Sequence, residues 1–153
     1  SCMCAALALS ENGGGEIVSI DPNLDEEFLN NLSKTFPSDW FKMIRFVKGK
    51  SQEYLAEEKQ RSKKYDLIYI DGDHTYEATK RDWELCKDNY NNFLIFDDYH
   101  LPGKVQKDIE CSNLIDQIED ESKELIIMDR RIFLDDRGYS DEEIDYGQVL
   151  LTR

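Results

Sequence analysis

Basic residues are scarce in this chain, and long apolar runs are absent. Only 19 lysines and arginines stand against 33 aspartates and glutamates, which gives a net charge of −14. Such a charge repels phosphate backbones and anionic membranes, so neither nucleic acid nor a membrane is expected as a partner. No apolar run approaches the roughly 20 residues of a membrane span, and no signal peptide with a charged start is present. We therefore expect a soluble, cytoplasmic protein.

The cysteines lack the spacing of a metal-binding or disulfide framework. There are four, Cys2, Cys4, Cys86 and Cys111, with no CxxC pair among them. This pattern excludes a zinc finger and favours reduced, partly buried thiols. With 153 residues and 40% hydrophobic content, the chain is expected to be one domain, residues 1–153, that buries a real core.

Apolar runs alternate with helical patterns from end to end. We expect strands over 16–21, 43–48, 66–70, 92–96, 125–128 and 148–152, and helices over 2–10, 25–36, 51–63, 75–89 and 105–118. The runs at 66–70 and 92–96 show no period-two alternation, which is typical of strands buried on both faces of a parallel sheet. The helical segment between them is long enough for a parallel crossover. The class is therefore α/β with a mainly parallel sheet.

Two neighbouring strands of this sheet end in acid. Asp71 follows one, and Asp97 and Asp98 follow the other. Ligands of open α/β sheets bind outside the carboxyl ends of the strands, so the three carboxylates are expected to converge. Converging carboxylates repel one another unless a cation or protons neutralise them, and oxygen ligands suit Mg²⁺, Mn²⁺ or Ca²⁺ better than zinc. We predict a metal site at these three residues.

The two histidines receive different interpretations. His74 lies three residues after Asp71, close enough to take a proton from a hydroxyl held on the metal. Histidine, with a reference pKa near ~6.5, is suited to general base catalysis at neutral pH. The alternative is a loop histidine bonded to a backbone carbonyl. His100 is expected at the surface, and Asp73 is expected to shape the turn with Gly72.

Three further residues are candidates for nucleotide binding. Asp21 ends a strand, where nucleotide-binding folds place a carboxylate that accepts hydrogen bonds from ribose, although an Asp before Pro22 also commonly forms a turn. Ser51 and Gln52 follow the next strand and could contact an adenine edge or cap a helix. Glycines 13–15 follow a helix, so they cannot form the glycine-rich turn of a dinucleotide site.

Several segments resemble class I S-adenosylmethionine-dependent methyltransferases. They are SIDPN, VKGKSQEYL, DLIYIDGDHTYEATKRDWEL, and LIFDDY followed by PGKV. Within that class they are most similar to the branch of metal-dependent sugar O-methyltransferases of macrolide biosynthesis and the proteins called cephalosporin hydroxylase-like. The match extends from the first helix to about Val105, and IDGDHTYE is its most specific part. The resemblance implies a Rossmann-like, doubly wound sheet with an antiparallel last strand.

The resemblance also implies a role for each cofactor-binding residue. Asp21 would bind the ribose of S-adenosylmethionine, and Ser51 and Gln52 would contact its adenine. Asp71 would belong to both the cofactor site and the metal site. The first strand and its glycine-rich loop, which should support the methionine and ribose, are missing from the pattern, so we expect the domain to be incomplete at its amino end.

For the metal site the implied residues are the acids already singled out. Asp71 matches the first metal-binding acid, Asp97 and Asp98 match an acidic pair, and His74 matches the base of the sugar enzymes. Mg²⁺ is the metal that the resemblance suggests. Asp97 stands where the sugar enzymes usually have glutamate, a difference that would shorten its reach to the metal.

The function implied is methyl transfer from S-adenosylmethionine, with metal assistance, to a hydroxyl of a small molecule or sugar. A nicotinamide-dependent Rossmann oxidoreductase that uses Asp21 on its ribose is one alternative, although hydride transfer does not need the acid cluster. A non-catalytic binding module with the methyltransferase fold is another. The methyl acceptor and the possibility of a homo-oligomer are left open by the sequence, and residues 130–146 are candidates for the acceptor pocket.

Overall fold

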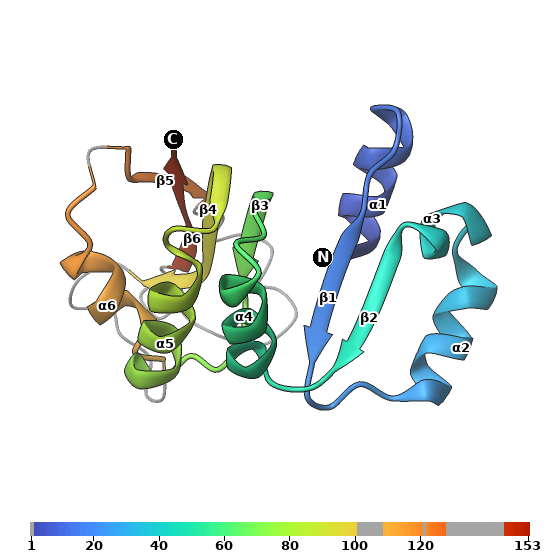
Figure 1. The fold of residues 1–153 in the computed structure, drawn as a ribbon, viewed down its shortest axis with the longest axis horizontal. Helices are drawn as coiled ribbons and strands as arrows, with labels where there is room; N and C mark the ends of the chain where they lie inside the picture. The colour runs from blue at the N-terminus through green and yellow to red at the C-terminus, as the bar shows by residue number, and fades with distance from the viewer. Residues whose placement is uncertain (1, 101–108, 121, 128–145) are drawn as a thin grey trace, which may run out of the picture. The chain divides into compact units, whose positions relative to one another are not determined.

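The structure, a computed structural model, describes residues 2–100, 109–120, 122–127 and 146–153. The chain forms two compact units, Ser1–Tyr54 and Leu55–Arg153, and Figure 1 shows their helices and strands. Within the described residues no helix has the length and apolar character needed to cross a membrane.

The first unit is a two-stranded parallel sheet with helices. Its elements are α1 (Cys2–Glu11), β1 (Ile17–Asp21), α2 (Glu26–Thr35), α3 (Ser38–Lys42), β2 (Ile44–Lys48) and the start of α4 (Ser51–Gln60). The register of β1 on β2 runs from Ile17 opposite Ile44 to Asp21 opposite Lys48. The two strands therefore end side by side at Asp21 and Lys48.

Local sequence signals explain most of these boundaries. α1 ends where the Gly14 amide, in a residue with φ of +103°, donates to the Leu9 carbonyl at 2.7 Å. α2 begins after Asp25, whose side chain accepts a hydrogen bond from the Glu27 amide at 3.0 Å. The short α3 was not predicted, since five residues carry too little helical periodicity to be seen.

The second unit is a four-stranded sheet with order β3-β4-β6-β5. Its elements after α4 are β3 (Tyr65–Ile70), α5 (Tyr76–Cys86), β4 (Tyr90–His100), α6 (Cys111–Gln117), β5 (Glu124–Ile127) and β6 (Tyr146–Thr152). β3 and β4 are parallel, whereas β6 is antiparallel to both β4 and β5. The predicted α/β class, mainly parallel with an antiparallel last strand, is confirmed.

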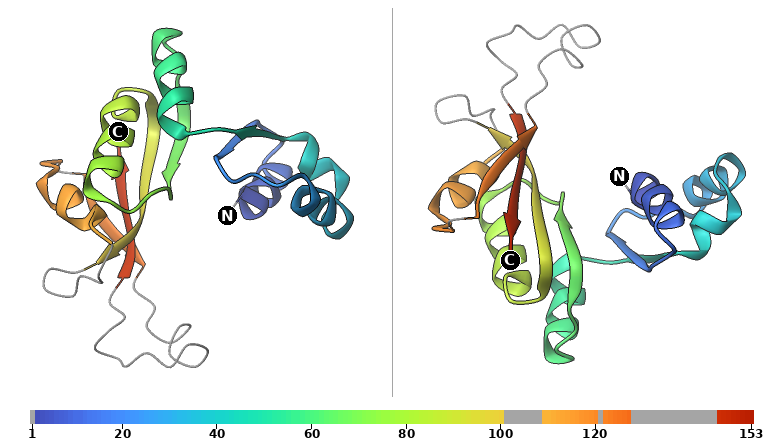
Figure 2. Two further views of the ribbon diagram at one scale, coloured as in Figure 1. Left: turned by 90° about the horizontal axis from the view of Figure 1, so that it is seen from below. Right: turned by 90° about the horizontal axis from the view of Figure 1, so that it is seen from above.

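The core of the second unit lies between one face of this sheet and helices α5 and α6 (Figures 1 and 2). Leu94, Phe96 and Leu151 on the sheet are at most 1% exposed. The opposite face is different, because Leu67 and Phe93 are 47% and 44% exposed. The prediction that β3 and β4 are buried on both faces is therefore met only on the helix-covered face.

The largest correction concerns β4, which does not end before the acids. It continues through Asp97 and Asp98 to His100, because β6 pairs with it on both sides of a register shift between Phe96 and Tyr99. His100, expected at the surface, is 1% exposed. Because β6 pairs with this segment, the predicted end of the strand lies in the interior of the longer strand β4.

Some predicted segments fall outside the described residues. These are residues 130–145 of the 130–146 segment proposed to line an acceptor pocket, residue 128 of a predicted strand, and residues 105–108 of the predicted 105–118 helix. The described part of that helix, α6, begins only at Cys111.

Candidate functional site

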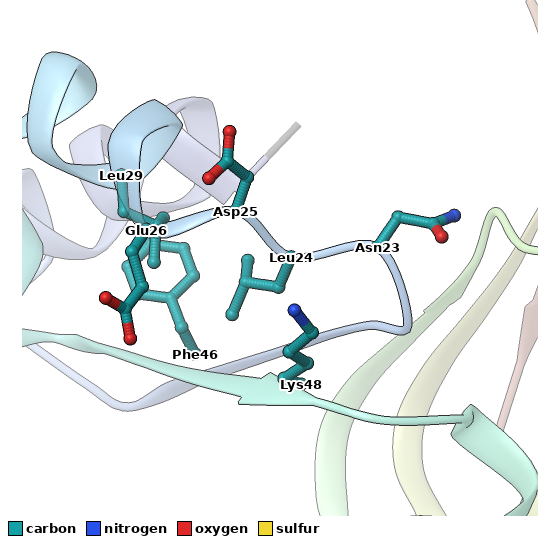
Figure 3. Close-up of a pocket in the computed structure, with 7 residues that line it drawn as sticks. All are labelled: Asn23, Leu24, Asp25, Glu26, Leu29, Phe46 and Lys48. Carbon is teal, nitrogen blue, oxygen red and sulfur yellow. The ribbon is translucent and has the colours of Figure 1, made fainter.

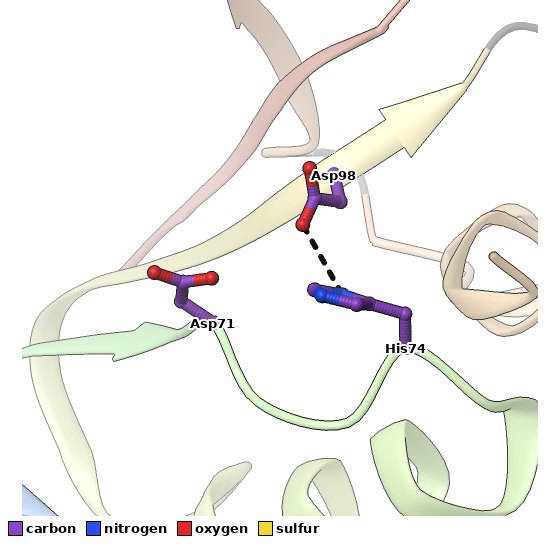
Figure 4. A group of neighbouring side chains, drawn as sticks. All are labelled: Asp71, His74 and Asp98. Carbon is purple, nitrogen blue, oxygen red and sulfur yellow. Dashed lines mark ion pairs between the residues drawn. The ribbon is translucent and has the colours of Figure 1, made fainter. Parts of the chain in front are cut away.

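Three predicted site residues come together in the second unit (Figure 4). Asp71 follows β3, His74 lies in the loop before α5, and Asp98 lies in β4. One nitrogen or oxygen atom of each residue lies within 4.8 Å of those of the other two. Nδ1 of His74 is 3.2 Å from Oδ2 of Asp98. We call Asp71, His74 and Asp98 the acid–histidine cluster.

The loop that carries His74 is held by its own hydrogen bonds. Oδ1 of Asp73 accepts from the Thr75 amide at 3.0 Å, so Asp73 forms the turn that was predicted for it. Thr75 caps α5 by accepting from the Ala78 amide at 3.4 Å. The backbone carbonyl of His74 accepts from the Glu110 amide at 2.8 Å. The His74 ring is thereby directed to Asp98, rather than being a loop histidine bonded only to backbone.

Two consecutive acids of β4 make separate sets of contacts. Asp98 has a φ of +54°, in the left-handed region, and lies within the register shift of the strand. Asp97 accepts a hydrogen bond at Oδ2 from the Tyr69 hydroxyl, and one at Oδ1 from Nε2 of Gln148 at 3.1 Å. The same Gln148 nitrogen donates to the Tyr69 hydroxyl oxygen at 2.9 Å. At this register shift, Asp98 joins the acid–histidine cluster, whereas Asp97 is hydrogen-bonded to Tyr69 and Gln148.

The electrostatics of the cluster favour uptake of positive charge. Burial raises the pKa of Asp71, and the charges of Asp97 and Asp98 raise it further. Burial is also the main cause that raises the pKa of Asp98, and the nearby His74 opposes it. Burial, followed by the hydrogen bond to Asp97, raises the pKa of the Tyr69 phenol well above its usual range. Protons or a cation would relieve the repulsion among these acids.

The predicted cofactor residues Asp21, Ser51 and Gln52 lie in the first unit. Asp21 is exposed at the end of β1, and its Oδ1 accepts from the Asn23 amide at 2.7 Å. Its backbone carbonyl accepts from the Gly49 amide at 3.3 Å, which ties the end of β1 to the end of β2. Ser51 and Gln52 are the first two residues of α4, and both are partly exposed. The turn role of Asp21 is present, and its second carboxylate oxygen stays a candidate for ribose.

A hollow of about 540 Å³ lies in the first unit (Figure 3). Its lining combines apolar with polar or charged side chains from the segment between β1 and α2, from α2 and from β2, namely Asn23, Leu24, Asp25, Glu26, Leu29, Phe46 and Lys48. Sequence reasoning did not predict this hollow, because its lining residues are separated in the sequence and meet only in the folded unit.

Comparison with known proteins assigns the chain to a family. A family model described as a methyltransferase domain matches residues 1–99, more than half of the chain. The chain belongs to this methyltransferase family. The apo structure of CalS11, described as a TDP-rhamnose 3'-O-methyltransferase in calicheamicin biosynthesis, matches with a TM-score of 0.52 and 20% identity. No curated protein matches.

The CalS11 match shows the fold of this chain. It covers 90% of this chain and 57% of the CalS11 chain, so the chain spans less than two thirds of that protein. The predicted family resemblance is confirmed by the family match, and the predicted fold class by the structural match.

The acid–histidine cluster fits the divalent cation that the resemblance implies. Its two carboxylates lie close enough to approach one ion and offer oxygen ligands that Mg²⁺ or Mn²⁺ could accept with waters in the remaining positions, and the imidazole of His74 lies within the same group. The cluster differs from the predicted set, since it contains His74 and does not contain Asp97. The metal role of Asp97 remains a prediction.

Sequence reasoning missed two residues that bond to Asp97 next to the acid–histidine cluster, Tyr69 and Gln148. Tyr69 was taken as part of an apolar strand, and Gln148 as the first residue of a closing strand. One signal was available for Tyr69: strand alternation places it on the same face as Asp71, two residues later. Gln148 could not have been found, because nothing local predicts that β6 brings it beside Asp97.

Proposed function

We propose that this methyltransferase transfers the methyl group of S-adenosylmethionine to a hydroxyl of a small molecule or sugar, with the help of a divalent cation. The observation that supports it is the pairing of His74 with Asp98, beside Asp71, in a chain of the methyltransferase family. Hydroxyl methylation needs a group that takes the hydroxyl proton, and the cluster offers one next to anionic ligands.

Three residues of the first unit are proposed to bind the cofactor. Asp21 would accept hydrogen bonds from the ribose hydroxyls, since it is an exposed carboxylate at the end of a parallel strand. Ser51 and Gln52, at the start of α4, offer hydroxyl and amide groups that can pair with an adenine edge. Asp71 is proposed to contact both cofactor and metal.

The cation would be held by Asp71 and Asp98, with Asp97 as the third predicted carboxylate. Each Asp97 oxygen already accepts a hydrogen bond and retains a further lone pair. When bound, the cation would neutralise the acids and lower the pKa of a hydroxyl coordinated to it.

His74 is proposed as the base. If Nδ1–H donates to Asp98, the lone pair is on Nε2, which can accept the proton of the acceptor hydroxyl. The hydroxyl oxygen then forms its bond to the methyl carbon as the bond from carbon to sulfur breaks, leaving S-adenosylhomocysteine. Asp98 stabilises the imidazolium that results.

A sugar hydroxyl is the first acceptor to test. This suggestion rests on the fold shared with CalS11, whose description names a TDP-rhamnose substrate. Calorimetry of the full-length protein with S-adenosylmethionine, with and without Mg²⁺ or Mn²⁺, tests the cofactor. Transfer of labelled methyl groups to a panel of nucleotide sugars and phenols then tests the acceptor. Absence of S-adenosylmethionine binding would contradict the proposal.

Replacing Asp98 separates the metal role from cofactor binding. Asp98→Ala removes a cluster carboxylate and the partner of His74, so we expect metal-dependent turnover to fall by about 100-fold or more. The affinity for S-adenosylmethionine should stay close to that of the parent. Asp88→Ala, at a carboxylate with a 66% exposed side chain, is the matched control. Unchanged turnover of Asp98→Ala in saturating Mg²⁺ would refute the metal role.

A further inference from the structure

A closed hydrogen-bond network joins three neighbouring strands beside the acid–histidine cluster. Tyr69 of β3 donates to Asp97 of β4, and Gln148 of β6 donates to both of them, at 3.1 Å to Oδ1 of Asp97 and 2.9 Å to the Tyr69 oxygen. All three side chains are partly buried. We call these three residues the Asp97 network.

One assignment of donors and acceptors satisfies all three hydrogen bonds of this network. Tyr69 donates its hydroxyl proton to Asp97, so the Tyr69 oxygen is left to accept, and a carboxylate accepts hydrogen bonds. The amide nitrogen of Gln148 supplies the donors that both groups need. A methionine at position 148 would fill similar space without donating, and a glutamate would add a repelling charge.

The network lies where the backbone of β4 departs from regular geometry. β4 has one more residue than β6 between the pairs Phe96–Val149 and Tyr99–Gly147. The extra residue lets two consecutive side chains, Asp97 and Asp98, serve different partners. Asp98 adopts a φ of +54°, a conformation that is unfavourable for a residue with a side chain and has to be held by its surroundings.

Two sets of contacts hold this segment. On the Asp98 side, the Cys111 thiol donates to the Asp98 carbonyl at 3.1 Å. On the Asp97 side, the network holds the carboxylate itself from both flanking strands. A side chain bonded at both oxygens cannot rotate without losing those bonds, so the network fixes the direction of the Asp97 carboxylate.

We infer that Tyr69 and Gln148 are positioning residues, which hold Asp97 and thereby fix the bulge that directs Asp98 to His74. Neither residue is bonded to a member of the cluster in the part of the chain that the structure describes; they act through Asp97. The inference deepens the proposed function and rests on it for its effect on metal binding. Its effect on the His74–Asp98 pair is independent of any metal.

The contact between His74 and Asp98 can be observed directly in the metal-free protein. The chain has two histidines, His74 and His100, so ¹⁵N-histidine NMR gives few signals to assign. In Tyr69→Phe and Gln148→Met we expect the His74 Nδ1 proton signal to move or broaden, because Asp98 is no longer held opposite the ring. Tyr76→Phe and Gln117→Met are matched controls, since this Tyr–Gln pair is hydrogen-bonded at 3.0 Å outside the cluster.

Metal affinity gives a second readout. Loss of outer residues that orient a metal ligand typically costs about 10- to 100-fold in affinity, and we expect that loss for Mn²⁺ in both variants by calorimetry. Binding of S-adenosylmethionine should stay at the parental level. If Gln148→Met does not fold, Tyr69→Phe, which removes a single hydroxyl, decides the question.

A double variant tests whether the two residues act through Asp97. In an Asp97→Ala background, Gln148→Met is expected to produce no further change in the His74 signal. Additive changes, or an unaltered His74 signal in both single variants, would overturn the inference. If the parent binds S-adenosylmethionine but no Mn²⁺, the metal part of the proposed function fails, and the NMR signal still decides the positioning role.

Discussion

At the scale of single residues, the carboxylates of the acid–histidine cluster are expected to lower the stability of the folded protein. Asp71 and Asp98 lie near each other and near Asp97, and both have pKa values raised by burial. A folded state that holds such groups ionised at neutral pH is less stable than one without them. Functional sites commonly carry this kind of cost, since a ligand relieves it when bound.

Neutralising one acid should therefore stabilise the metal-free protein. Asp98→Asn removes one repelling charge, can still accept a hydrogen bond from His74, and tolerates the left-handed backbone of position 98. We expect the free energy of unfolding in a chelator to rise by about 1 kcal/mol. Urea unfolding at neutral pH measures it.

Addition of Mn²⁺ completes this comparison. The parent should gain stability with the metal by mass action, whereas Asp98→Asn should gain little. Asp88→Asn, at an exposed position, controls for the loss of one negative charge. A parent that gains no stability from Mn²⁺ would count against a metal site.

At the scale of elements, the connection between α4 and β3 is held by a buried acid. Glu58 of α4 is 2% exposed. It accepts hydrogen bonds from the Tyr65 hydroxyl at 2.8 Å and from Nη1 of Arg61 at 2.9 Å, and Lys63 lies 3.7 Å away. The Tyr65 hydrogen bond is the main cause that lowers the pKa of Glu58.

Removing that hydroxyl should weaken the connection in a pH-dependent way. A lowered carboxyl pKa contributes stability above the ordinary value of 4.5, and this contribution is lost as pH falls through the lower folded-state value. Tyr65→Phe should cost about 1–2 kcal/mol at neutral pH. The difference from the parent should shrink below pH 4.5.

Urea unfolding from neutral pH to about pH 3 measures this difference. Tyr76→Phe, whose hydroxyl bonds the exposed Gln117, serves as the control. An equal loss of stability at every pH would show that Tyr65 acts by packing alone.

At the scale of the whole molecule, the chain divides into two compact units whose boundary falls inside α4. The proposed cofactor residues Asp21, Ser51 and Gln52 belong to the first unit, and the acid–histidine cluster to the second. The interpretation of residues 1–153 as one methyltransferase domain remains a prediction, as do the cytoplasmic location and the acceptor.

Charge is the other property of the whole molecule with a testable consequence. With a net charge of −14, we expect the protein not to bind duplex DNA or single-stranded RNA at about 0.1 M salt, because the phosphates would be repelled. Fluorescence anisotropy of labelled oligonucleotides tests this, with a basic DNA-binding protein as the positive control. Saturable binding would reveal a local basic surface that the sequence does not indicate.

Much of the fold could be predicted, because its signals are local. Strand and helix order follow from apolar runs and periodicity, and the start of α2 follows from its capping residue Asp25. Asp71 and His74 were found for the same reason: the end of β3 and the start of α5 are both encoded within a few residues of them. The resemblance of these segments to methyltransferases was also readable directly from the sequence.

The rest depended on contacts between residues far apart in the chain. Only the pairing of β6 with β4, some fifty residues apart, extends β4 through its acids, creates the bulge and brings Gln148 to Asp97. The extended strand contains the buried His100, and the residues that line the hollow of the first unit also meet only in the folded structure. By itself the sequence indicated that Asp71, His74 and Asp98 come together. Only the tertiary structure decided that Asp98 pairs with His74 while Asp97 is bonded to Tyr69 and Gln148, because strand pairing, and not local propensity, sets the direction of each side chain.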